Sequence, residues 1–336
     1  MKVLLYSGFL KIISKSGVGE AIRHQAATLE NQNIAYTTKV RDDYDVVHLN
    51  TIFPDSLLVS KWAKRRGKKV IFYGHTTEED FKNSFVGSNF FAPLFKRWIT
   101  ACYNSADFII TPTAYSKGLL DQYGLRPPIH VLTNGIDTDF FSEDPGARLR
   151  FHTKYNIAED QKVVISVGHY IERKGIMDFV ELARQLPEYQ FYWFGYTNPR
   201  LVPKNVKLAL ATALPNLHFP GYVGKNDLKD AYCGSDLFLF LTYEETEGIV
   251  MLEALAAKTP ILVRDIPIYT DWLREGETVY KGNSLPTFRQ KIVGILTNEL
   301  PNLTLNGRRL AEECDLKIVG EKLNTIYGKL FSSTQC

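Results

Sequence analysis

The segment SDLFLFLTYEETEGIVMLEALA, residues 235–256, decides the fold of this 336-residue chain. Its first seven residues include an apolar run of the length of a buried strand, and residues 242–248 form the loop that leaves the strand's carboxyl end. The loop ends at Gly248, and the apolar residues that follow predict a helix. Strand, loop and helix in this order form one unit of a doubly wound α/β sheet, in which ligands bind at the carboxyl ends of the strands.

This loop carries the groups of a binding site. Gly248 lets the backbone approach a ligand, and the N–H groups of Gly248, Ile249 and Val250 at a helix start form an anion site. Glu245 precedes the helix and Glu253 lies about two turns inside it, so we do not expect them to act on one face as an acid–base pair. We expect each carboxylate to accept hydrogen bonds from different hydroxyls of one extended ligand. A sugar nucleotide has this layout, with phosphates between two hydroxylated rings.

The chain divides into two similar halves. Residues 3–6 and 16–20 with the helix after them begin the first half, and residues 162–168 with a helix at 175–186 begin the second. Each start is a strand, a glycine-containing loop and a helix, which is typical of doubly wound sheets. The polar segment 141–156 contains Pro-Gly and is predicted to be the linker. Further buried strands are predicted at 46–49, 69–73, 108–110, 130–132, 191–194 and 260–263.

Composition narrows the class of protein. The four cysteines are scattered without a Cys-x-x-Cys pair, so neither a zinc site nor a disulfide framework is expected. The apolar run at residues 1–6 is short and is followed by Lys11 and Lys15, so we expect a strand and not a signal peptide. No stretch is long enough to span a bilayer. The net charge is only +3, which does not favour a nucleic-acid partner. The cytoplasm is the expected location.

Glu245 and Glu253 resemble the Glu-x7-Glu motif of retaining glycosyltransferases of GT-B architecture in family 4, and supporting residues follow in order along nearly the whole chain. The resemblance implies an α/β fold with two Rossmann-like doubly wound domains facing a cleft. Residues 1–145 would form the acceptor and membrane side, 155–308 the nucleotide-sugar domain, and 309–330 a helix that crosses back to the first domain. It also implies that Glu245 contacts the donor hexose, that Glu253 holds the ribose hydroxyls, and that the amides after Gly248 contact sugar and diphosphate.

The loop at residues 169–175, HYIERKG, follows the first strand of the second half. The adjacent cations Arg173 and Lys174 suit the neutralisation of a diphosphate leaving group. By resemblance, Lys174 is the phosphate-binding lysine of the family. The family commonly has an arginine where this chain has His169, so Arg173 is expected to supply the second charge from another position. The chain lacks the metal-bound diphosphate site of the other large glycosyltransferase fold, so no metal is expected.

Other positions face the same predicted cleft. Gly17 and Gly19 lie between the first strand and its helix, where they would cradle the phosphate or the acceptor. His75 follows a strand directly, and the resemblance implies that it positions donor hydroxyls or a backbone carbonyl and does not abstract the acceptor proton. Residues 134–137 resemble a structural turn of the family. The segment around Tyr222 matches the one whose backbone reads the nucleotide base, for which the family favours uracil.

The first half also carries a basic and aromatic segment. Residues 61–69 hold six cations and no acid, and residues 81–102 place aromatic side chains at near-helical spacing. Cations beside exposed aromatics suit an anionic membrane interface, but the same pattern also fits core aromatics and a solvated helix end. The residues expected to contact the acceptor or the membrane are Lys64, Arg65, Arg66, Lys68, Phe90, Phe91, Phe95, Lys96, Arg97 and Trp98.

The whole chain, including residues 15–19, 111–116 and 166–175, resembles the subgroup that makes diglycosyl diacylglycerols. That resemblance implies transfer of glucose or galactose from a UDP-sugar to monoglucosyl-diacylglycerol by front-face attack, giving an α-linked product. The enzyme would bind peripherally to the cytoplasmic face of the cell membrane. One alternative is the same chemistry on a soluble or polyprenyl-linked saccharide. Another is a GT-B protein that is not a transferase, such as a sugar-nucleotide epimerase or a non-catalytic scaffold. The sequence leaves open the donor sugar, the linkage and the oligomeric state.

Overall fold

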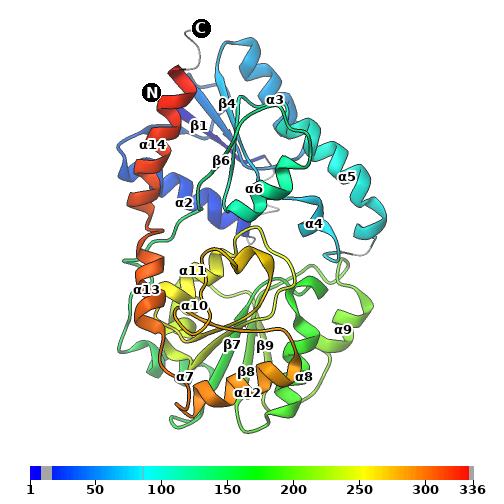
Figure 1. The fold of residues 1–336 in the computed structure, drawn as a ribbon, viewed down its shortest axis with the longest axis vertical. Coiled ribbons are helices and arrows are strands. Elements are labelled where there is room, and N and C mark those ends of the chain that lie inside the picture. The colour runs from blue at the N-terminus through cyan, green and yellow to red at the C-terminus, as the bar shows by residue number, and fades with distance from the viewer. Residues whose placement is uncertain (9–16, 86, 333–336) are drawn as a thin grey trace.

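The computed structural model describes residues 1–8, 17–85 and 87–332, so Lys11, Lys15 and Ser16 lie outside the described residues. Within these ranges the chain forms two lobes, each built on a parallel six-stranded sheet with helices around it (Figure 1). Two doubly wound units were predicted, and this prediction is confirmed.

The first lobe contains the sheet β2-β1-β3-β4-β5-β6. Its strands are β1 Lys2–Tyr6, β2 Ala35–Thr37, β3 Val46–Leu49, β4 Lys69–Tyr73, β5 Phe108–Thr111 and β6 Ile129–Val131. Its helices are α2 Gly17–Asn31, α3 Pro54–Arg65, α4 Glu78–Phe81, α5 Ser88–Tyr103 and α6 Ala114–Asp121.

The second lobe contains the sheet β12-β11-β10-β7-β8-β9. Its strands are β7 Val163–Val167, β8 Gln190–Phe194, β9 Leu217–Gly221, β10 Leu237–Phe240, β11 Ile261–Arg264 and β12 Tyr280–Gly282. Its helices are α7 Ala147–Tyr155, α8 Ile176–Gln185, α9 Lys204–Leu210, α10 Lys225–Gly234, α11 Ile249–Ala256, α12 Leu285–Leu296 and α13 Thr304–Glu312, with short 3₁₀ turns η1 Glu172–Lys174 and η2 Pro267–Tyr269.

Each central strand is buried on both faces because helices cover both sides of its sheet. In β10, Leu237 and Leu239 pack into one core cluster and Phe238 and Phe240 into the other. Strand side chains alternate between the two faces, so a continuous apolar run fills both cores. This arrangement places the loop after β10 at the edge of the sheet where all its strands end.

The last helix, α14 Leu316–Ser332, belongs to the first lobe. Its apolar side chains Val319, Leu323 and Leu330 share a core cluster with Val3 of β1. Figure 1 shows α14, in red, beside α2 and the blue strands of the first sheet. The predicted crossing of the C-terminal helix is therefore confirmed.

The predicted linker at residues 141–156 is wrong for most of its length. Residues 147–155 form α7, which packs closely on α10. The side chains of Phe141 and Phe151 are buried in the core of the second lobe. The Pro-Gly pair precedes the helix and starts it, so polar composition here marks an exposed helix face and not an unstructured connection.

Candidate active site

The main cleft lies between the two lobes and has an accessible volume of about 630 Å³. It is large enough for a sugar nucleotide, since small-molecule sites in proteins commonly measure about 300–1,000 Å³. Gly19, predicted for the site, is instead buried in the first turn of α2. The predicted residues that line the cleft are Gly17, His75, His169, Arg173, Lys174, Tyr222, Glu245, Gly248, Ile249, Val250 and Glu253.

The start of α11 faces this cleft. Gly248 has a φ of +85°, and a Cβ there would meet the ring of Phe240 at 3.4 Å. Glycine is therefore the residue that this turn accepts most easily. The first N–H groups of a helix have no partner within the helix, so the amides of Ile249 and Val250 are placed for an anion.

Lys174 and Glu245 form a buried ion pair in the cleft. The ammonium of Lys174 contacts Oε1 of Glu245, and the hydroxyl of Thr242 donates to the same oxygen over 3.1 Å. Burial alone would raise the pKa of Glu245, but Lys174 and Arg173 hold it below its usual range. Glu245 is therefore an ionised hydrogen-bond acceptor at neutral pH, as its predicted contact with a hexose requires.

Arg173 reaches across the cleft to the first lobe. Its Nη2 lies 3.0 Å from Oδ1 of Asp80, and its Nε donates to the hydroxyl of Ser84 over 3.2 Å. It also donates to the backbone carbonyl of Glu244. The guanidinium thus joins the lobes in this structure, and its action on a diphosphate stays a prediction.

His75 follows β4 and is buried in the wall of the first lobe. Its Nε2 donates to Oδ1 of Asn50 over 3.1 Å, and that oxygen also accepts from Gln25 over 2.6 Å. Burial lowers the pKa of His75 to about 4, so the imidazole is neutral at pH 7. A neutral ring held by Asn50 fits the predicted positioning role.

Glu253 lies deeper on the second-lobe side. The hydroxyl of Tyr232 donates to its Oε2 over 2.9 Å. Burial, with a smaller contribution from Glu20, raises the pKa of Glu253 to about 7. His169 also lines this side and donates from Nδ1 to the carbonyl of Tyr196 over 2.7 Å.

Sequence reasoning missed the residues that fasten the loop at 242–248 to the first lobe. Glu247 is buried and accepts hydrogen bonds from Thr133 and Asn134. Asp80 and Glu244 are also bound across the cleft. Nothing in their spacing in the sequence identifies them, because the partner of each one lies in the other lobe and more than 90 residues away in the chain.

The aromatic residues of α5 that were predicted to contact the membrane differ in exposure. Phe90, Phe91 and Leu94 of α5 are exposed, with 81%, 55% and 64% of their surfaces accessible. Phe95 instead stacks on Phe81 with 4.0 Å between ring centroids, and Trp98 donates its indole N–H to a backbone carbonyl over 2.6 Å. Phe95 and Trp98 are therefore half-buried packing residues. The predicted membrane contact is left to the exposed residues in the first turns of α5.

The cations that were predicted to contact the acceptor or the membrane also differ, because the lysines form ion pairs within the protein. Lys64 and Lys68 pair with Asp107 and Asp43, each at 3.0 Å, and Lys96 lies 3.3 Å from Glu78. Arg65, Arg66 and Arg97 are exposed. The guanidinium of Arg66 lies 4.5 Å from the ring centroid of Trp62, so Arg65 and Arg97 are the predicted cations best placed to meet another surface.

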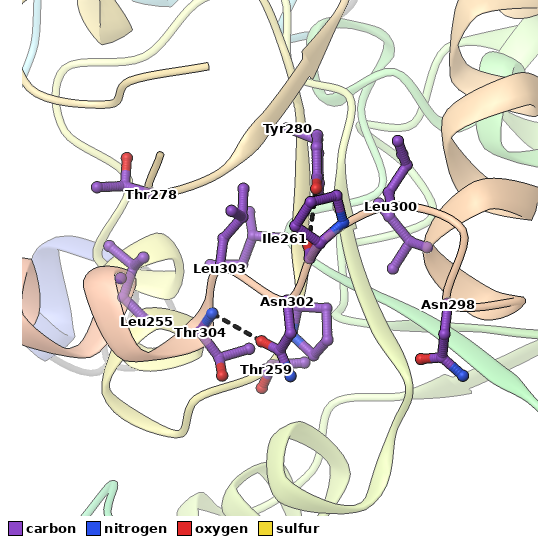
Figure 2. Close-up of a pocket in the computed structure, with 14 residues that line it drawn as sticks. Leu255, Thr259, Ile261, Thr278, Tyr280, Asn298, Leu300, Asn302, Leu303 and Thr304 are labelled. Atoms are coloured by element: carbon purple, nitrogen blue, oxygen red, sulfur yellow. Dashed lines mark hydrogen bonds between the residues drawn. The ribbon is translucent and has the colours of Figure 1, made fainter. Parts of the chain in front are cut away.

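A second pocket lies away from the cleft, between α11, α12 and α13 (Figure 2). Figure 2 shows Leu255, Tyr280 and Leu300 around it, and the hydroxyl of Tyr280 donates to the carbonyl of Pro301 over 2.7 Å. Its accessible volume of about 50 Å³ suits a few water molecules and not a sugar. It contains none of the predicted site residues.

The described residues show neither a metal-binding cluster nor a membrane-spanning helix. In residues 1–8, 17–85 and 87–332, no group of three or more His, Cys, Asp or Glu side chains is arranged to hold a metal ion. Over the same ranges, no helix combines the length and apolar character needed to cross a bilayer.

Comparison with known proteins identifies the family. The family described as Glycosyltransferase Family 4 matches residues 24–140, and Glycosyl transferases group 1 matches residues 148–311. The chain is 39% identical over 328 residues to the processive diacylglycerol alpha-glucosyltransferase of Acholeplasma laidlawii, covering 97% of this chain and 98% of that one. The chain belongs to the GT-B glycosyltransferases of family 4. The predictions of family, fold class and enzyme class are thereby confirmed.

Other relatives of this glycosyltransferase agree. The alpha-galactosylglucosyldiacylglycerol synthase of Streptococcus pneumoniae is 27% identical over 266 residues, which are 76% of this chain and 71% of that one. HepE of Anabaena, solved in complex with UDP and glucose, has the same fold with a TM-score of 0.79. It covers 98% of this glycosyltransferase and 100% of its own chain at 15% identity.

Proposed function

We propose that the enzyme transfers glucose or galactose from a UDP-sugar to a diacylglycerol glycolipid, with monoglucosyl-diacylglycerol as the acceptor and an α-linked diglycosyl-diacylglycerol as the product. The observation that carries this proposal is the nearly full-length similarity to a diacylglycerol alpha-glucosyltransferase. The ionised, buried groups of the cleft supply the chemistry. The family assignment, with Glu245, Glu253 and Lys174 in one cleft, argues against a GT-B protein that is not a transferase.

The donor would lie along the second-lobe wall of the cleft. Glu245 accepts hydrogen bonds from hexose hydroxyls, and Glu253 accepts them from the ribose. Lys174 and the amides of Ile249 and Val250 surround the diphosphate, where preorganised positive groups stabilise the charge that develops on the leaving group. We expect no metal at this site, and this stays a prediction from the sequence.

The transfer step retains the anomeric configuration. The bond from the anomeric carbon to the phosphate oxygen breaks, and the acceptor hydroxyl forms the new bond on the same face. The departing phosphate oxygen takes the hydroxyl proton. His75 has a pKa of about 4, so its ring is neutral at pH 7 and carries a single proton. That proton is donated to Asn50, so His75 does not act as an acid, and we assign it to orienting hydroxyls.

The acceptor would enter from the first lobe at α4 and α5. Phe81, Ser84 and Phe85 line the cleft, and the exposed Phe90 and Phe91 continue the apolar surface outward. In Figure 1, α4 borders the gap between the lobes and α5 runs outward from it. An apolar face at the cleft edge would let the lipid chains stay in the membrane while the head group reaches the donor. The enzyme would therefore bind peripherally to the cytoplasmic face of an anionic membrane.

The test uses purified enzyme with UDP-glucose or UDP-galactose and vesicles of anionic phospholipid that contain monoglucosyl-diacylglycerol. We expect a diglycosyl lipid, identified by mass, with an α-anomeric signal by NMR. Parallel reactions contain diacylglycerol, a polyprenyl-linked saccharide or a soluble saccharide. Product from only the polyprenyl-linked saccharide or the soluble saccharide would overturn the lipid assignment. The Glu245→Ala variant should form no product with any acceptor.

A further inference from the structure

Glu247 is a buried carboxylate whose role the donor chemistry does not explain. It lies in the loop between Glu245 and Gly248, and only 4% of its surface is exposed. Within the described residues, three groups donate to it, and all three belong to the first lobe. They are the hydroxyl of Thr133, the backbone N–H of Asn134 at 3.1 Å and the side-chain amide of Asn134 at 2.6 Å.

The turn that holds Glu247 is itself fixed to the first lobe. The hydroxyl of Thr133 accepts from the N–H of Gly135 over 3.1 Å, and His24 of α2 donates to the carbonyl of Gly135 over 2.8 Å. The donors that face Glu247 are thus part of a rigid wall. Separation of the lobes would remove all three donors from the carboxylate at once.

The same loop makes further hydrogen bonds to the first lobe. The hydroxyl of Tyr115 donates to Glu244 over 3.0 Å, and the hydroxyl of Thr113 donates to the carbonyl of Thr246 over 2.9 Å. The hydroxyl of Thr246 in turn donates to the carbonyl of His75 over 3.3 Å. Among these residues, Glu247 accepts the most hydrogen bonds from the first lobe, and it lies directly before Gly248, whose φ is +85°. Its position therefore sets both the direction of Glu245 and the start of α11.

We propose that Glu247 is a positioning residue that couples closure of the two lobes to the shape of the donor loop. When Glu247 binds Thr133 and Asn134, Glu245 and the amides of Ile249 and Val250 take the places that hold the donor. When the lobes separate, the carboxylate loses its partners and the loop relaxes. The donor site is thus complete only in the closed enzyme.

Glu247→Gln tests this coupling because glutamine keeps the shape but turns one acceptor into a donor that faces the amide of Asn134. Hydrogen exchange is measured on the enzyme without donor. We expect faster exchange in residues 242–250 and 133–135 together, and a 10- to 100-fold lower kcat/KM for UDP-glucose with the glycolipid acceptor. Glu143→Gln, an exposed glutamate of the second lobe, should change neither quantity.

The decisive variant combines Glu247→Gln with Asn134→Asp, which puts the carboxylate on the other side of the same contact. It should restore slow exchange and at least a tenth of the wild-type kcat/KM, and failure to restore either would overturn the proposal. If Glu247→Gln does not fold, Thr133→Val removes one donor and should give the same exchange pattern with a three- to tenfold loss. The kinetic measurement rests on the proposed substrates, whereas the exchange measurement uses the protein alone and decides without them.

Discussion

Arg173 and Asp80 form an ion pair that joins the two lobes, with 3.0 Å between Nη2 of the arginine and Oδ1 of the aspartate. The side chains are 9% and 22% exposed, so water screens the pair only weakly. Removal of Arg173 leaves the buried Asp80 without this partner, and removal of Asp80 leaves the buried Arg173 with the more distant carboxylate of Glu245 at 3.9 Å. Loss of both residues should therefore cost less than the sum of the two single losses.

A double-mutant cycle should therefore show strong coupling between these residues. We expect Asp80→Ala and Arg173→Ala each to lower the free energy of unfolding, and the double variant to lose about 2 kcal/mol less than the sum of the two. Urea unfolding followed by fluorescence measures the cycle. The exposed pair of Lys317 and Asp139 is the control, with 68% and 81% of their side chains accessible and an expected coupling below about 1 kcal/mol. Additive effects of Asp80 and Arg173 would show that the pair does not join the lobes.

Lys174 should be essential for the departure of the diphosphate. Lys174→Met keeps the length of the side chain but removes the charge, and we expect kcat to fall by a factor of about 10²–10³. Initial rates at saturating donor measure this effect. Lys117→Met is the control, because Lys117 pairs with Asp121 on the exposed face of α6. A change in KM with an unaltered kcat would assign Lys174 to ground-state binding only.

The affinity for UDP should rise with pH through the titration of Glu253. The pKa of this carboxyl is about 7 because of burial, and only the ionised form can accept from both ribose hydroxyls. Binding therefore favours loss of the proton, so the Kd should fall from pH 6 to pH 8 by up to about tenfold. Calorimetry on the wild type and on Glu253→Gln separates this from the titration of the phosphate. Parallel pH profiles for the two proteins would rule out the role of Glu253.

Membrane binding should depend on the exposed side chains of α5. We expect Phe90→Ser, Phe91→Ser and Leu94→Ser together to abolish flotation with vesicles that contain anionic lipid, because the variant removes the apolar surface that would enter the interface. The control changes three equally exposed leucines of the second lobe to serine: Leu149, Leu208 and Leu305. Equal flotation of the two variants would place the membrane contact elsewhere. Trp98 is not a useful probe, since its indole N–H is bound to the backbone of Ile52.

The central strands could be predicted from sequence because each is an apolar run buried on both faces. The strands that were not predicted, β2, β9 and β12, all lie at the edges of their sheets. These edge strands are partly exposed, as Ala35–Thr37 and Leu217–Gly221 are, so no continuous apolar run marks them. The segment of α7 was predicted as a linker for a related reason, because it is mostly polar and its buried Phe151 is flanked by polar residues.

The donor wall of the site could also be predicted, because Lys174, Glu245 and Glu253 lie on loops and helices that follow strands of one sheet. The contacts between lobes could not. Glu245 and Glu247 are both glutamates of one loop. Glu245 binds Lys174 of its own lobe, whereas Glu247 binds Thr133 and Asn134 of the opposite lobe. Their difference arises from how two separately folded units meet, and no local pattern encodes it.

The position of α14 has a consequence for synthesis on the ribosome. Val319, Leu323 and Leu330 complete the core beside Val3, so the core around β1 cannot close until α14 has been translated. The second lobe, whose strands lie between residues 163 and 282, can assemble earlier. A premature stop shortly before Leu316 would therefore damage the amino-terminal half of the polypeptide more than the half in which the stop occurs.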